Sequence, residues 1–98
     1  MSKLNIGNID PIIHSKYRLG ILALLAGGDE IDFNFFKGEL GITDGNLSIH
    51  LRKLEEKSFI SMKKQFVKRK PKTTFRITEN GLHQYRQYLE EISKLFNS

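Results

Sequence analysis

A block of basic residues is the feature of this sequence with the clearest chemical use. The 25 residues from Arg52 to Arg76 contain ten basic side chains and two acidic ones, so the block carries a charge of +8. The whole chain of 98 residues carries +5, which leaves −3 for the other 73 residues. A basic region on a slightly acidic domain is typical of proteins that bind a polyanion, although a solvated lysine-rich face would have the same composition.

Side chains just before this block, together with its first residue, have the chemistry to read base edges in DNA. Asn46 can pair with adenine, Arg52 with guanine or a phosphate, and Ser48 with either base. Ile49 can contact the methyl group of thymine. An apolar stripe occupies the opposite side of the same segment: Leu47, Leu51 and Leu54. We therefore expect the polar residues to share the exposed face of one helix, and a need for solubility alone does not explain Ile49 there.

Catalysis and metal binding have little support in the sequence. The chain has no cysteine, which excludes disulfides, thiol nucleophiles and cysteine zinc sites. Its histidines, His14, His50 and His83, fall on three different predicted helices, and the common catalytic and phosphate-binding motifs are absent. We expect a protein that is not an enzyme and that binds no metal and no cofactor.

Apolar spacing and capping residues predict three helices before the basic block, over residues 10–27, 32–41 and 43–58. Asp10 and Pro11 suit the start of the first helix, and Gly27 ends it. Asp32 and Thr43 are the expected caps of the second and third helices. So few residues separate the second helix from the third that we expect a helix-turn-helix.

The pattern changes to alternation after the third helix and predicts a two-stranded β-hairpin over residues 59–78. Its connection, residues 68–72, is basic except for Pro71, which we expect in a loop because proline cannot donate to a strand ladder. Thr78 is the expected cap of a last helix over residues 79–96. We therefore expect the fold class α+β, mainly α, with a single domain, residues 1–98, built as a winged helix-turn-helix. Its expected parts are a three-helix core, a two-stranded β-hairpin wing and a C-terminal dimerisation helix. In this order of elements the third helix fits the major groove and the wing reaches phosphates or the minor groove.

The segment Leu40–Glu55, LGITDGNLSIHLRKLE, resembles the helix-turn-helix core of small winged-helix transcriptional regulators akin to the MarR-like and ArsR-like repressors. The similarity extends from residues 13–22 through residues 69–78 to the start of the last helix. It implies a homodimer that is paired through its first and last helices and binds a pseudo-palindromic operator. The resemblance assigns Asn46, Ser48 and Arg52 to DNA contact, and Arg69 and Lys70 to the wing. Many relatives have a basic residue in place of Ile49, so no base preference is transferred there.

Two sets of residues make up the predicted interfaces. The set predicted to contact double-stranded DNA is Thr43, Asn46, Ser48, Ile49, Arg52, Lys53, Lys68, Arg69, Lys70 and Lys72. The set predicted to form the dimer interface is Leu4, Ile6, Ile9, Leu82, Tyr85, Leu89, Ile92 and Phe96. The last five follow a 3-4-3-4 spacing, and packing within the chain must account for part of this stripe. Two-fold pairing would place two recognition helices roughly 34 Å apart, one turn of DNA.

Two alternatives remain open. The chain could be a winged-helix protein–protein interaction module without DNA binding, with the terminal stripe as its contact surface. It could also be a ligand-responsive regulator whose unidentified small-molecule effector binds a pocket lined by Phe35, Tyr17 or Tyr88. The longest apolar stretch, residues 21–26, is far shorter than the roughly 20 residues of a membrane span, and residues 1–10 lack a signal pattern. We therefore expect no membrane contact and a cytoplasmic location.

Overall fold

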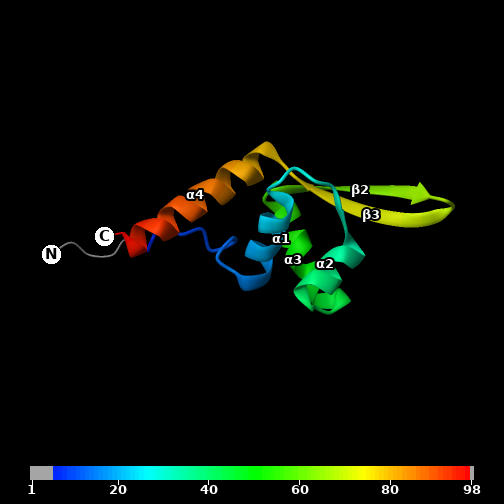
Figure 1. Cartoon of the computed structure of the whole chain (residues 1–98), viewed down its shortest axis with the longest axis horizontal. Helices are drawn as coiled ribbons and strands as arrows, with labels where there is room; N and C mark the ends of the chain where they lie inside the picture. Colours follow the sequence, from blue (N-terminus) through cyan, green and yellow to red (C-terminus); the bar gives the residue numbers. More distant parts are fainter. Residues whose placement is uncertain (1–5, 98) are drawn as a thin grey trace.

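The computed structural model describes residues 6–97. The elements in chain order are α1 Lys16–Leu25, β1 Ile31–Asp32, α2 Phe33–Leu40, α3 Asp44–Glu56, β2 Ile60–Val67, β3 Lys70–Ile77 and α4 Glu79–Phe96. Helices α1, α2 and α3 gather in one group, while the β2–β3 hairpin and α4 extend away from it in opposite directions (Figure 1). The molecule is therefore elongated, at 62 × 26 × 20 Å. The predicted α+β class, mainly helical, is confirmed.

Local capping explains where most helices begin. The predicted caps accept a backbone N–H bond through their side chains: Asp32 from Phe35 at 2.7 Å, Thr43 from Asn46 at 3.3 Å and Thr78 from Gly81 at 2.9 Å. Gly41 ends α2 in the left-handed region, with φ of 59°, where glycine has no steric penalty. The helix-turn-helix formed by α2 and α3 therefore lies where the sequence predicts it.

The start of α1 differs from the prediction of residue 10. The helix begins at Lys16, and its cap is Ser15, whose side chain accepts from the backbone N–H of Arg18. Asp10 instead accepts a bond from the N–H of Ile12 at 2.8 Å and closes a separate turn. Ser15 itself is extended, with φ of −152°, so the turn and the helix cannot be continuous. The turn places Ile13 in the core, where it is fully buried.

The sheet has one strand more than predicted. β1, only two residues long, pairs antiparallel with β3, and the strand order is β1-β3-β2. Ile31 faces Phe75 and Asp32 faces Thr74 in this register. A two-residue strand is too short to show an alternating pattern, so the sequence could not predict β1. The strand is defined by its pairing with β3.

The hairpin turn is shorter than predicted. Val67 pairs with Lys70 and Phe66 pairs with Pro71, so only Lys68 and Arg69 form the turn. Pro71 therefore lies in β3, and its predicted place in a loop is wrong. In a two-residue hairpin the closing pair is hydrogen-bonded and the next pair is not, so the nitrogen of Pro71 points away from β2 and no ladder bond is lost.

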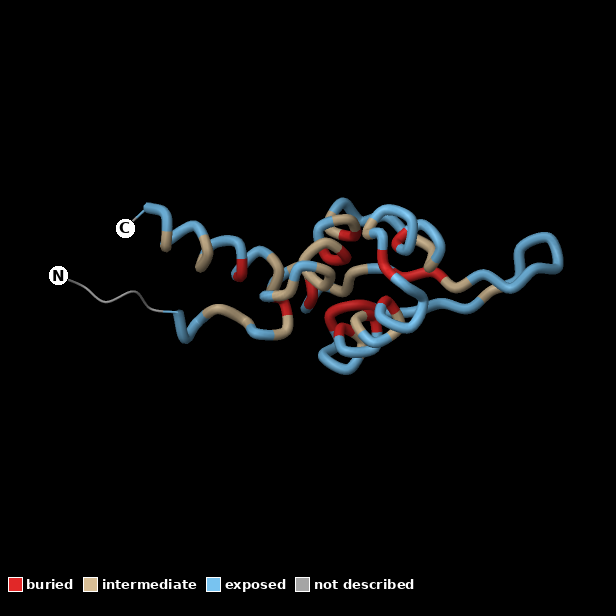
Figure 2. Tube along the Cα trace, turned by 90° about the horizontal axis from the view of Figure 1, so that it is seen from below, coloured by how far each residue is buried: buried red, intermediate tan, exposed pale blue. Residues whose placement is uncertain are grey.

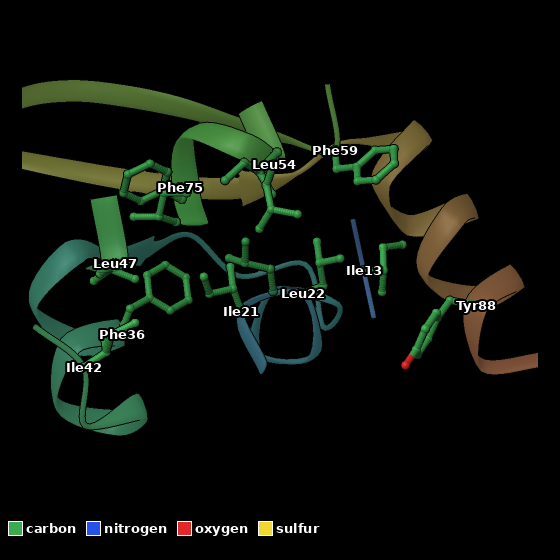
Figure 3. Packing of buried hydrophobic residues seen from close by; sticks show 13 residues of the cluster. Ile13, Ile21, Leu22, Phe36, Ile42, Leu47, Leu54, Phe59, Phe75 and Tyr88 are labelled. Carbon is green, nitrogen blue, oxygen red and sulfur yellow. The ribbon is translucent and has the colours of Figure 1, made fainter. Parts of the chain in front are cut away.

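The core lies between α1, α2, α3 and the base of the sheet (Figure 3). Its fully buried residues include Ile21, Leu22 and Leu25 of α1, together with Phe36 and Leu47. The rings of Phe36 and Phe75 meet edge to face, with centroids 6.1 Å apart. The predicted stripe of α3 is buried as expected. This packing leaves the opposite side of α3 facing outward.

Helix α4 packs on the core through Tyr88, which is buried, and through the partly buried Tyr85 and Ile92 (Figures 2 and 3). The predicted stripe is only partly covered: Leu82, Tyr85 and Ile92 are half-buried, while Leu89 and Phe96 are exposed. Tyr88, outside the stripe, is the buried position, and its hydroxyl forms a hydrogen bond with Nδ1 of His14 at 2.8 Å. In residues 6–97 no helix is long and apolar enough to cross a membrane.

Candidate nucleic-acid interface

A groove of about 690 Å³ runs between α3 and the β2–β3 hairpin. Its walls bring together predicted contact residues from both elements, Ser48 and Arg52 from α3 and Lys70 and Lys72 from the wing. Its charged lining consists of Arg52, Lys64, Lys70 and Lys72 on the basic side, with Asp32 and Glu55 on the acidic side. The groove is therefore net basic, as the binding of a polyanion requires.

The outward face of α3 extends the groove. Ile49 is 48% exposed, and Asn46 and Lys53 are exposed beside it. Asp44, an acidic residue that would repel phosphate at the start of α3, is held by Lys37 with an N–O distance of 2.7 Å. Thr43 uses its side-chain oxygen as the helix cap, which leaves its hydroxyl hydrogen for a further partner.

His50 lies on the side of α3 that faces α1, away from this surface. Its Nδ1 accepts a bond from Nη1 of Arg18 at 2.9 Å, and its ring lies 5.6 Å from that of Tyr17. Burial, followed by the nearby cations Arg18 and Lys53, lowers the pKa of His50. A neutral His50 therefore joins α3 to α1, which fixes the helix that carries the contact residues.

The two basic residues at the tip of the wing have a backbone conformation that is energetically unfavourable for their residue types. Lys68 and Arg69 have φ values of 52° and 66°, the left-handed region required at both central positions of a type I′ turn. Asparagine and glycine are favoured there, and other residues cost about 1–2 kcal/mol each. The chain keeps two long basic side chains at this site despite the cost, and both are exposed.

The carboxylate of Glu30, which no sequence pattern indicated, binds both strands of the wing. Oε1 of Glu30 accepts a bond from Oγ1 of Thr74 at 2.5 Å and from Nε2 of Gln65 at 3.3 Å, and Oε2 pairs with Nη2 of Arg76 at 3.1 Å. The Thr74 bond, and then the Arg76 bond, lower the pKa of Glu30. Glu30 thus ties the loop before β1 to both strands of the hairpin. These contacts join residues 35 to 46 positions apart, so no local pattern in the sequence could reveal them.

Acidic partners also reduce the free charge of the basic block. Arg76 is paired with Glu30, and Nζ of Lys72 lies 3.9 Å from Oδ2 of Asp32. The block's charge of +8 is therefore partly compensated at the base of the wing. The positive charge is concentrated toward the tip, where Lys68, Arg69 and Lys70 are exposed.

Replacing Glu30 with glutamine should lower stability at neutral pH and flatten the loss of stability in acid. The pKa of Glu30 is lowered from its ordinary value of 4.5, so its contribution is complete above that value and disappears as the pH falls through the folded-state pKa. Thermal unfolding followed by circular dichroism from about pH 6 to about pH 3 measures this effect. Glu39→Gln, at an exposed position of α2, is the charge-matched control. Equal pH profiles for the two variants would contradict the role of Glu30.

Comparison with known proteins identifies the family. The family model of the winged helix DNA-binding domain matches residues 17–96. The chain belongs to this winged-helix family. The predicted winged helix-turn-helix fold is thereby confirmed.

Individual relatives agree with this assignment. An uncharacterized protein of Methanocaldococcus jannaschii is 44% identical over 84 residues, which cover 86% of this winged-helix chain and 91% of the relative. A transcriptional regulator homologue from Pyrococcus horikoshii OT3 has a similar structure, with a TM-score of 0.81 and 28% identity over 88% of this chain and 85% of the other. A MarR-family protein from Porphyromonas gingivalis W83 shares the fold, with a TM-score of 0.69 and 23% identity over 89% and 83% of the two chains. The predicted resemblance to winged-helix regulators is confirmed, and the likeness to the MarR-family protein is one of fold.

The residues suggested for an effector pocket do not come together. Tyr17 contacts His50, Tyr88 contacts His14, and Phe35 is exposed on α2. A second groove, of about 420 Å³, lies instead between residues 7–11 and the side of α4 that carries Gln84, Gln87, Tyr88 and Glu91. Within residues 6–97, no group of three or more His, Asp or Glu side chains is arranged to hold a metal ion.

Helix α4, which carries five of the predicted dimer residues, extends away from the wing (Figure 1). Leu4 falls outside the described residues. Ile6 is exposed and Ile9 is half-buried beside α4. Phe96, at the end of α4, is 82% exposed, and Leu89 is 44% exposed. The described part of the chain therefore covers the apolar strip of α4, Leu89 and Phe96, only in part.

Proposed function

We propose that this winged-helix chain is a cytoplasmic, sequence-selective transcriptional regulator that binds double-stranded DNA as a homodimer. The observation that carries the proposal is the groove in which Ser48 and Arg52 of α3 face Lys64, Lys70 and Lys72 of the wing. In this proposal α3 enters the major groove, and the wing neutralises phosphates of the adjacent backbone. The ten predicted contact residues divide between these two tasks.

Binding to random duplex DNA over a series of salt concentrations tests the proposal. Release of counterions makes the logarithm of the binding constant fall linearly with the logarithm of salt, by about 0.9 for each neutralised phosphate. We expect binding at low salt that weakens steeply as salt rises. Absence of binding to any duplex at the lowest salt would contradict the proposal and favour the protein–protein interaction module.

Asn46→Ala should reduce discrimination between DNA sequences more than it reduces general affinity. Asn46 is exposed on α3 and can form two hydrogen bonds with adenine, and a good bidentate contact contributes about 1–3 kcal/mol to discrimination. The measurement is the ratio of the dissociation constants for a selected duplex and a random one. Equal losses on both duplexes would remove Asn46 from the set of base-reading residues.

Leu89→Glu should convert the proposed homodimer into a monomer. Leu89 is partly exposed in the apolar strip of α4, and two-fold pairing would bury a carboxylate against its symmetry mate. Sedimentation equilibrium reports the mass of each variant. His83→Glu, at an exposed position on another side of α4, adds the same carboxylate and should remain dimeric. A monomeric wild-type chain, or a dimeric Leu89→Glu variant, would contradict pairing through this strip.

A further inference from the structure

The wing carries an exposed aromatic residue that the folded chain does not use. Phe66 is 78% exposed near the end of β2, and its partner across the hairpin is Pro71. A phenylalanine that remains in water gains nothing from burial in the core. Around it the hairpin is basic, with Lys68, Arg69 and Lys70 all exposed.

The register places Phe66 and Pro71 on the face of the wing that continues into the groove. Directly opposed residues of an antiparallel pair share a face, and alternate residues of a strand return to it. Phe66 therefore lies on the same face as Lys64 and Met62, and both of these line the groove beside α3. Pro71 also lines this groove, and Phe66, its partner across the hairpin, lies beside the groove.

The hairpin is long enough to reach a neighbouring groove of DNA. Toward the tip, the last buried residue of β3 is Thr74, which pairs with Lys63, and Phe66 is three residues farther along β2. At about 3.3 Å per residue, Phe66 lies roughly 10 Å beyond that pair, and the turn at Lys68 lies roughly 17 Å beyond it. Half a turn of B-DNA is about 17 Å, so a wing that leaves α3 at the major groove spans the distance to the adjacent minor groove.

We propose that Phe66, supported by Pro71, inserts as an apolar wedge into the minor groove next to the major groove that receives α3, and that it bends the duplex. Phenylalanine and proline are among the residues that wedge between base steps and kink DNA toward the major groove. The cations of the turn supply the charge complementarity, because they flank the wedge where phosphates line both sides of the minor groove. This inference rests on the proposed binding of double-stranded DNA.

The test compares bending and affinity on one duplex. A duplex enriched by the wild-type chain from a random library carries a donor dye at one end and an acceptor at the other, with 2-aminopurine at its adenine positions in turn. We expect wild-type protein to increase energy transfer and to brighten 2-aminopurine at one step in the minor groove facing the wing. Phe66→Ala should abolish both signals and weaken binding roughly 5- to 100-fold, the range for removal of an aromatic side chain stacked on a base.

Two further variants control for changes of fold and of surface. Phe66→Leu keeps an apolar wedge and should retain most of the bend. Phe35→Ala removes another exposed phenylalanine, 49% exposed on α2, and should behave as wild type. All variants should melt at or near the wild-type temperature, because neither phenylalanine is buried.

Three outcomes would overturn the proposed wedge. Wild-type binding without bending, or Phe66→Ala binding with the wild-type bend and affinity, would overturn the wedge and leave the proposed DNA binding intact. A wild-type chain that enriches no duplex and binds none would overturn both.

Discussion

Replacing Lys68 with asparagine and Arg69 with glycine is expected to make the protein more stable and a weaker DNA binder. The two positions have φ values of 52° and 66°, for which the Asn-Gly turn is favoured. The substitution should therefore add about 1–2 kcal/mol to the free energy of unfolding. It also removes two cations from the tip of the wing.

The decrease in binding should be large and independent of sequence. Charge-assisted hydrogen bonds contribute about 1.5–3 kcal/mol each, so removal of both cations predicts a dissociation constant at least roughly 100-fold larger on every duplex. The slope of log affinity against log salt should become shallower by about 0.9 for each phosphate that the wing no longer neutralises. Thermal melts and salt titrations of the same preparation measure both effects.

A control variant that neutralises two cations on α4 distinguishes the effect of the wing tip on DNA binding from the effect of net charge. Arg86→Gln with Lys94→Gln removes the same charge from α4, which extends away from the wing (Figure 1). We expect this variant to bind DNA nearly as wild type does. If it loses as much affinity as the wing variant, net charge and not the wing tip controls binding.

Gly81→Ala is expected to cause the largest loss of stability. A methyl group at Gly81 would lie 1.9 Å from the carbonyl oxygen of Phe59 and within 3 Å of two more of its backbone atoms. That oxygen already accepts the N–H of Thr78, so Phe59 cannot move aside without breaking the bond that holds the cap residue of α4. Overpacking and the broken bond together predict a loss of about 2–5 kcal/mol in the free energy of unfolding.

The measurement is thermal unfolding, where such a loss lowers the melting temperature by roughly 10–20 °C or more for a domain of this size. Gly38→Ala is the control, because a methyl group at this position inside α2 meets no atom within 4 Å. It should add about 0.5–1 kcal/mol through the helix preference of alanine. A Gly81→Ala variant as stable as wild type would show that Phe59 and α4 do not touch as described.

The parts of the fold that could be predicted are those decided by neighbouring residues. The starts of α2, α3 and α4 follow from Asp32, Thr43 and Thr78, because a side-chain cap acts within three residues. The predicted start of α1 was wrong because Asp10 and Ser15 are both capping types. When Ser15 caps α1, the turn before it buries Ile13 in the core, and this tertiary contact cannot be read from the local sequence.

Contacts between distant residues could not be predicted. β1 exists only through its pairing with β3, and Glu30 matters only because folding brings it to Thr74 and Arg76. In the candidate interface, helical spacing predicted the exposed face of α3. The position of Pro71 in a strand could not be predicted, because the turn before it, Lys68-Arg69, lacks the glycine that usually marks a two-residue hairpin turn. Gly81 has its role through Phe59, 22 residues earlier, and nothing in the local sequence indicates it.

Selection of bound sites from a random duplex library tests the central claim most directly, because it asks at once whether the chain binds DNA, selects a sequence and pairs two recognition helices. We expect enrichment of a pseudo-palindrome whose half-sites lie about one helical turn, roughly 10 base pairs, apart. Absence of any enrichment, with no binding to duplex DNA at low salt, would contradict it.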